Sequence, residues 1–139
     1  MGRPSGPKNH CSGRMTDAEY RNFIKNQLRG ATRKWGPISE CKKKARVGFG
    51  EYKCACCGEV VPPTVYDDEK GKRVTNIFVD HIEPIIDPAV GWVSWDSTIE
   101  RMFCEADNLQ CLCGRCHKEK SLEEIAVAKA RRSKEKQDG

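Results

Sequence analysis

Two pairs of cysteines, each with a two-residue spacer, could together hold one metal ion. Cys54 pairs with Cys57, and Cys113 pairs with Cys116. A two-residue spacer lets both thiolates of a pair face the same ion. Four thiolates complete a tetrahedral zinc site and leave no open position, so we expect a structural Zn²⁺ and not a catalytic one. Such an ion would stabilise a chain too small for a large core.

The other five of the nine cysteines leave some choice in the ligand set. Cys56 lies inside the first pair and Cys111 precedes the second, so either could replace a neighbour, although the matched spacing favours the four cysteines above. Cys11, Cys41 and Cys104 have no partner at metal spacing. We expect them to be small buried residues or free thiols.

A second group of polar residues could perform hydrolytic chemistry. Asp80 and His81 are adjacent, Asn108 follows later, and His117 comes directly after the second cysteine pair. Each alone has a structural explanation, such as a hydrogen-bonded histidine or a turn asparagine. Hydrolysis of a phosphodiester needs an activated water, a group that stabilises charge on the phosphate, and help for the departing oxygen. A neutral imidazole can take a proton from water, and a carboxylate can bind a hard cation.

Strands are needed to bring these segments together. The turn 69–72 separates an apolar dipeptide at 65–66 from the run 74–82, which predicts a hairpin. Its second strand would end at Asp80 and His81. A further short strand is expected over 109–112, just before the second cysteine pair.

Helices are predicted on both sides of these strands. Thr16 and Glu19 form a capping-box pattern at the start of the first helix. Asp96 is expected to be the N-cap of a short third helix. Ser121 begins a second capping-box pattern, which would open a final amphipathic helix. The four predicted segments cover 16–30, 38–46, 97–103 and 121–132.

Charge divides the chain into three zones. Residues 1–50 hold 12 basic and 3 acidic residues, 51–110 hold 5 and 12, and 111–139 hold 8 and 5. Basic arms can bind a polyanion while an acidic centre holds a cation, although basic arms can also serve solubility alone. The candidate nucleic-acid-binding residues are Arg21, Lys25, Arg29, Lys42, Lys43, Lys44, Arg115 and Lys118.

The order of these motifs resembles that of the HNH endonuclease family, the ββα-metal nucleases. The resemblance is to small, free-standing phage-type members with a four-cysteine zinc knuckle. The matching stretches read VDHIEP at 79–84 and ADNLQCLCGRCHKEK at 106–120, and WVSWDSTIERMF at 92–103 looks like an insert of phage members. The likeness covers 52–120, about half of the chain.

The resemblance implies an α+β fold and metal-dependent cleavage of DNA. His81 would be the general base, Asn108 would hold the loop and orient His81, and Asp80 with His117 would bind one catalytic cation. That cation would be Mg²⁺ or Mn²⁺, and an imidazole ligand also suits Ni²⁺ or Zn²⁺.

The expected organisation is a flexible basic tail at 1–15, a basic helical extension at 16–50, the nuclease core at 51–121, and a C-terminal helix and tail at 122–139. Since no signal peptide or membrane span is evident, we expect a cytoplasmic protein, in the host cytoplasm if it is phage-encoded.

We expect a monomer or weak dimer that acts on DNA, although RNA stays open as a substrate. Two other interpretations are a non-catalytic zinc-knuckle module that binds nucleic acid and a zinc domain that binds protein. Binding by a non-catalytic module would be salt-sensitive and indifferent to His81 and Asp80.

Overall fold

The chain divides into two units in this computed structural model, which describes residues 6–138. The first unit ends at Lys34 and the second begins at Trp35. The division falls inside the stretch 16–50 that the sequence assigns to one extension, so the second predicted helix belongs to the larger unit. Residues 1–5, the start of the expected basic tail, lie outside the described residues.

The first unit is built on helix α1 (Asp17–Ala31), which begins at the predicted capping box. The hydroxyl of Thr16 accepts a hydrogen bond from the backbone N–H of Glu19 at 3.2 Å, and the Glu19 carboxylate accepts one from the N–H of Thr16 at 3.2 Å. Before it, residues 10–15 form a turn closed by backbone pairing of His10 with Met15. The 3₁₀-helix η1 (Thr32–Lys34) ends the unit.

The second unit begins with helix α2 (Gly36–Ala45), which packs on strand β7 (Leu109–Cys113). Trp35 precedes the helix and joins it to a distant part of the chain. Its indole Nε1 donates to the carbonyl of Cys104 at 2.7 Å, and its ring meets Phe103 edge-on at 5.6 Å. Helix α2 is therefore part of the framework of the unit.

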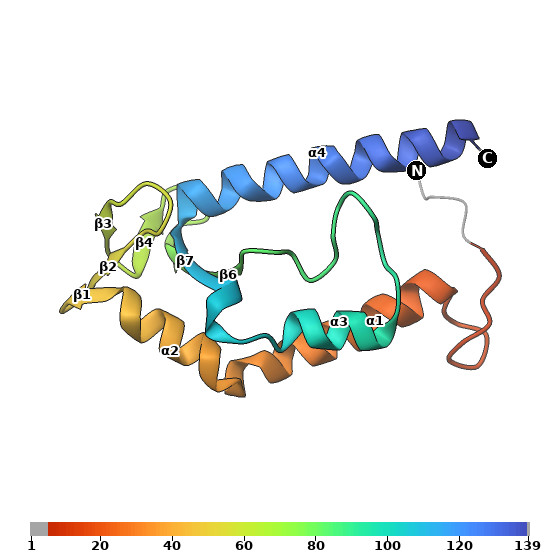
Figure 1. Cartoon of the computed structure of the whole chain (residues 1–139), viewed down its shortest axis with the longest axis horizontal. Coiled ribbons are helices and arrows are strands. Elements are labelled where there is room, and N and C mark those ends of the chain that lie inside the picture. The colour runs from red at the N-terminus through yellow and green to blue at the C-terminus, as the bar shows by residue number, and fades with distance from the viewer. Residues whose placement is uncertain (1–5, 139) are drawn as a thin grey trace. The chain divides into compact units, whose positions relative to one another are not determined.

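Within the described residues, the strands form three small antiparallel sheets, ordered β1-β2-β3, β4-β5 and β6-β7 (Figure 1). The remaining strands are β1 (Arg46–Gly48), β2 (Glu51–Lys53), β3 (Val60–Val61), β4 (Thr64–Asp67), β5 (Lys72–Thr75) and β6 (Ile77–His81).

The run 74–82, predicted as one strand, is divided between two sheets at Asn76. Val74 pairs with Val65 in the expected hairpin, whereas the residues after Asn76 form β6 and pair with β7. The backbone N–H of Asn76 donates to Pro63 at 2.8 Å, and its carbonyl accepts from Gly114 at 3.2 Å. These long-range bonds end the β4–β5 ladder and start the β6–β7 ladder. Because they depend on residues distant in the sequence, the apolar pattern alone did not reveal the break.

Helix α3 (Trp95–Met102) lies in the connection between β6 and β7 and is followed by the 3₁₀-helix η2 (Ala106–Asn108). The predicted N-cap, Asp96, was wrong because the cap is Ser94. The Ser94 hydroxyl accepts from the backbone N–H of Ser97 at 3.1 Å, and Asp96 lies in the first turn.

Helix α4 (Gly114–Asp138) follows β7 without a loop (Figure 1). The predicted start at Ser121 was wrong, since Ser121 lies inside a helix that begins at the second cysteine pair. Leu122 and Ile125 are exposed on it, so the helix presents no buried apolar side there. No helix among the described residues has the length and apolar character needed to cross a membrane.

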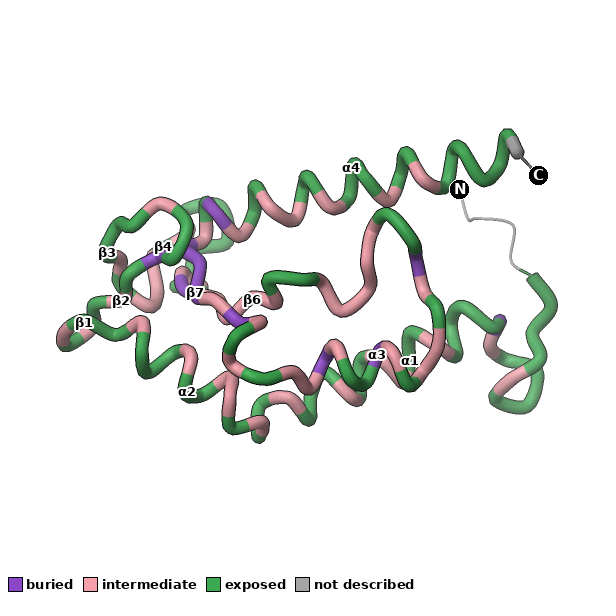
Figure 2. The backbone as a smooth tube through the Cα atoms, in the orientation of Figure 1, coloured by how far each residue is buried: buried purple, intermediate pink, exposed green. Residues whose placement is uncertain are grey.

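The core of the second unit is small and rich in sulfur. Its central cluster contains Leu112 and three cysteines, with Val61 packed against it. Figure 2 shows buried positions along β7 and at the start of α4, with others on α3 and in the loop before it, while most of α4 is half-buried or exposed. The predicted α+β class is confirmed: small antiparallel sheets and helices meet around a group of cysteines.

Candidate functional site

The four cysteines at matched spacing come together, as predicted. The sulfur atoms of Cys54, Cys57, Cys113 and Cys116 all lie within 4.8 Å of one another. A tetrahedral ion with Zn–S bonds of about 2.3 Å has sulfurs about 3.8 Å apart. The Sγ atoms of Cys57 and Cys113 are 3.9 Å apart, so the cluster fits a metal ion such as zinc.

Local backbone geometry prepares each cysteine pair. The first pair lies in a turn in which the N–H of Gly58 donates to the carbonyl of Cys54 at 3.0 Å. Gly58 has φ +75°, a conformation that glycine adopts without strain. In the second pair, Cys113 ends β7 and Cys116 lies in the first turn of α4. The cluster thus fastens this turn to the strand–helix junction.

Electrostatics favour a thiolate at Cys54, whereas burial raises the pKa of Cys116 in the same cluster. Burial acts to raise the pKa of Cys54, but hydrogen bonds from the backbone N–H groups of Cys113, Cys57 and Cys56 together outweigh it and lower that pKa to about 6. Hydrogen bonds to Cys116 and Cys57 raise the pKa of Arg115. The guanidinium of Arg115 therefore lies beside the sulfur cluster, where it offsets negative charge.

The alternative ligands, Cys56 and Cys111, are not part of the cluster. Cys56 is exposed. Cys111 is buried with its Sγ 3.8 Å from that of Cys41 on α2. Burial and the neighbouring Cys41 raise the pKa of Cys111 to about 12, so it behaves as a packed thiol between β7 and α2.

His81 lies at the end of β6 with its ring directed to helix α3. Its Nε2 is 2.9 Å from the backbone carbonyl of Met102. A carbonyl oxygen only accepts hydrogen bonds, so Nε2 must carry the proton, and Nδ1 is then the ring atom with a lone pair. A neutral imidazole in this tautomer can accept a proton at Nδ1.

Asp80 lies on the other face of β6, as expected for adjacent strand residues. Its side chain is only 15% exposed and its Oδ2 accepts from Lys120 Nζ at 2.5 Å. Oδ2 also accepts from Gln110 Nε2 at 3.1 Å, across the β6–β7 pair. Lys120 donates to the carbonyl of His81 at 2.6 Å as well. This carboxylate is therefore held where a cation already balances its charge.

His117 lies in the first turns of α4 and faces the side of β6 that carries Asp80. Its ring stacks on Phe78 with the centroids 4.3 Å apart. Phe78 and Asp80 are two residues apart and share one strand face. His117 and Lys120 are three apart on the helix and share its side. Asp80 and His117 therefore lie on facing surfaces of β6 and α4.

Asn108 fastens the segment that follows His81. Its Oδ1 accepts from the N–H of Glu83 at 2.8 Å, and its Nδ2 donates to the Glu83 carbonyl at 3.3 Å. The carbonyl of Asn108 also accepts from the N–H of Ile82 at 2.8 Å. Its bonds thus hold the loop, while the hydrogen bond that orients the His81 ring comes from Met102.

The candidate nucleic-acid-binding residues lie on three helices. Arg21, Lys25 and Arg29 are spaced four apart on α1, where burial and then the nearby Arg29 and Arg21 lower the pKa of Lys25. Close cations of this kind favour an anionic partner. Lys42–Lys44 are exposed in the last turn of α2, and Lys118 is exposed on α4.

The sequence did not reveal the roles of Lys120, Gln110 and Met102. Only the position of Lys120 offered a signal: it lies three residues after His117, which places both on the same side of a helix. Gln110 could be assigned only from the strand register, which pairs it with Asp80. Met102 acts through its carbonyl, which no side-chain pattern identifies.

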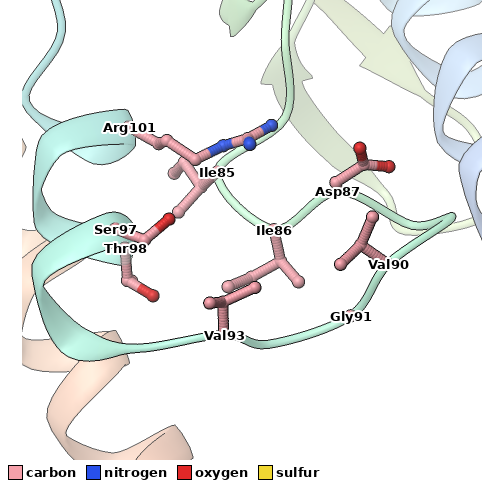
Figure 3. Close-up of a pocket in the computed structure, with 9 residues that line it drawn as sticks. All are labelled: Ile85, Ile86, Asp87, Val90, Gly91, Val93, Ser97, Thr98 and Arg101. Carbon is pink, nitrogen blue, oxygen red and sulfur yellow. The ribbon is translucent and has the colours of Figure 1, made fainter.

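A pocket in the β6–β7 connection is too small to hold a substrate. It has a volume of about 60 Å³, room for about two waters. Figure 3 shows Ile85, Ile86 and Val93 beside helix α3, with Arg101 and Asp87 at the edge. Arg101 Nε donates to the carbonyl of Pro84 at 2.8 Å. The pocket is thus a packing gap inside a loop that this hydrogen bond holds to helix α3.

Comparisons with known proteins do not identify the chain: no protein-family model, curated protein or solved structure matches it.

Proposed function

We propose that this protein is an endonuclease of the HNH type that hydrolyses phosphodiester bonds in DNA. The observation that carries the proposal is the state of His81, whose protonated Nε2 bonds to Met102 and whose Nδ1 is left as the basic atom. The adjacent Asp80 supplies a fixed carboxylate on the other face of the same strand. Two antiparallel strands followed directly by a helix, β6, β7 and α4, support the ββα-metal assignment.

In this proposal, His81 takes a proton from the attacking water at Nδ1. The Met102 carbonyl holds the ring and stabilises the imidazolium that results, because its partial negative charge faces the Nε2 proton. Asn108 keeps the loop after β6 in place through its two bonds to Glu83. General-base assistance of this kind contributes about 100- to 10,000-fold to rate.

We propose that Asp80 and His117 hold a catalytic divalent cation, which would displace Lys120 from the Asp80 carboxylate. One carboxylate and one imidazole on facing surfaces suit Mg²⁺ or Mn²⁺, with Ni²⁺ or Zn²⁺ as further options. Among the described residues, the cysteine cluster is the only group of three or more close metal-binding side chains. No third protein ligand is therefore expected beside Asp80 and His117, and water and phosphate would complete the coordination of the catalytic cation. The ion would polarise the scissile phosphate and stabilise the departing oxygen.

The test uses supercoiled plasmid and zinc-loaded protein. With Mg²⁺ or Mn²⁺ added, we expect the supercoiled plasmid to be converted to open-circular or linear DNA. With Ca²⁺ alone we expect no conversion, because the catalytic ion has to activate the phosphate. Salt-sensitive binding with no cleavage in any of these metals would contradict the proposal and favour the non-catalytic binding module. The same assay on RNA would decide the substrate class.

Lys120 should compete with the catalytic cation for Asp80, because its ammonium lies 2.5 Å from Oδ2 and Glu124 Oε1 is 3.3 Å from the same nitrogen. We expect Lys120→Met to tighten Mn²⁺ binding roughly tenfold, about 1.4 kcal/mol, because a positive charge leaves the site. Mn²⁺ titration followed by electron paramagnetic resonance measures this. Lys134→Met, an exposed change on the same helix, should leave the affinity unaltered, and weaker Mn²⁺ binding in Lys120→Met would refute the competition.

A further inference from the structure

The tip of the β1–β2 hairpin presents a phenylalanine to solvent. Phe49 is 95% exposed, the highest fraction among the large hydrophobic side chains that are exposed in the described residues. The hairpin turns at Phe49 and Gly50, and Gly50 has φ +65°, so the backbone holds the ring at the tip. Burying a phenylalanine away from water is favourable, and this position forgoes that gain in the isolated chain.

One cation lies over this ring, and others lie nearby on the hairpin and the end of α2. The guanidinium of Arg46 lies 5.9 Å from the Phe49 ring centre, and Lys42 lies 5.9 Å from the ring centre of Tyr52 in the next strand. Residues 42–53 contain five basic side chains and one acidic side chain, Glu51. A partner that matches this surface must combine negative charge with flat apolar faces. Nucleic acid has both, in its phosphates and its bases.

An open hollow lies beside the hairpin. It has a volume of about 420 Å³ and is lined by Lys44, Val47 and Lys53 together with the first cysteine turn, 54–58. Both lysines are exposed. The hollow gives an adjacent sugar–phosphate segment room to approach the two ammonium groups while a base contacts the tip.

The β4–β5 hairpin carries no net charge. Tyr66 is 58% exposed there, but the three acidic residues at 67–69 are balanced by Lys70, Lys72 and Arg73. Because this hairpin has no net positive charge, it attracts a polyanion less than the β1–β2 hairpin does. Tyr66 therefore provides a matched control on the same unit.

We propose that the β1–β2 hairpin is a nucleic-acid contact in which Phe49 stacks on an unpaired or unstacked base. Lys44, Arg46 and Lys53 bind the neighbouring phosphates. The inference rests on the proposed function in so far as nucleic acid is the ligand of both sites. It adds a base contact to the phosphate contacts proposed for the basic helices.

The test measures binding of a fluorescent single-stranded oligodeoxynucleotide by fluorescence anisotropy, with full-length zinc-loaded protein in Ca²⁺. We expect Phe49→Ala to weaken binding about 5- to 150-fold, the range for loss of one base–aromatic stack. Phe49→Trp should restore it, and Tyr66→Ala should bind like the wild type. On an abasic oligonucleotide of equal charge, Phe49→Ala should match the wild type, because no base is present to stack.

Equal affinity of Phe49→Ala and wild type for the base-containing oligonucleotide would overturn the inference. An equal loss on abasic and normal strands would also overturn it, since the effect would then not come from stacking. Failure of the proposed function is a separate result: a protein that binds through Phe49 but cuts no plasmid with Mg²⁺ or Mn²⁺ keeps this inference and loses the nuclease.

Discussion

Replacing His81 with alanine is expected to slow plasmid cleavage about 100- to 10,000-fold, the range for loss of a general base. The substitution removes Nδ1, the ring atom that the bond to Met102 leaves free to accept a proton. Initial rates of supercoiled-plasmid loss in saturating Mg²⁺ measure the effect. Since His81 is at the end of β6 and half-exposed, the fold and the bound zinc should persist.

His10→Ala is the matched control for this experiment. His10 lies in the turn before α1, where its Nε2 is 2.7 Å from Asp17 and its ring stacks on Tyr20. We expect its rate of cleavage to equal that of the wild type. Full activity in His81→Ala, with zinc content and circular dichroism unchanged, would remove His81 from the mechanism and leave the base unidentified.

Replacing Cys54 with serine is expected to unfold the second unit. Cys54 is 1% exposed, at the centre of the small core, and its sulfur also accepts from the N–H of Cys113 at 3.3 Å. Structural zinc supplies about 10–16 kcal/mol of apparent binding energy in small zinc domains, comparable to the whole stability of a typical domain. We expect loss of helical circular dichroism, of zinc and of cleavage together.

Cys56→Ser provides the comparison, because Cys56 lies in the same turn but is exposed and outside the cluster. It should retain one zinc per chain, measured with a chromogenic chelator after denaturation, and unaltered thermal unfolding. Equal damage from Cys54→Ser and Cys56→Ser would show that the ligand set is wrong. Prolonged treatment with a strong chelator should reproduce the Cys54→Ser result in the wild type.

Much of the cysteine cluster could be predicted because its geometry is local. A two-residue spacer places both sulfurs of a pair on one side of a turn, so Cys54 with Cys57 and Cys113 with Cys116 required only that the two turns meet. The capping box at Thr16 is local in the same sense and is observed. The capping pattern at Ser121 failed because the helix had already started at the second cysteine pair.

The sequence by itself determined which four cysteines cluster, the α+β class and the residue types that the proposed hydrolysis uses. Only the tertiary structure decided how those residues are held. Lys120 reaches Asp80 across 40 positions, and Met102 fixes the His81 ring across 21. Such contacts depend on strand register and on where α4 begins. Those features are set by packing of the whole unit, which residue spacing does not encode.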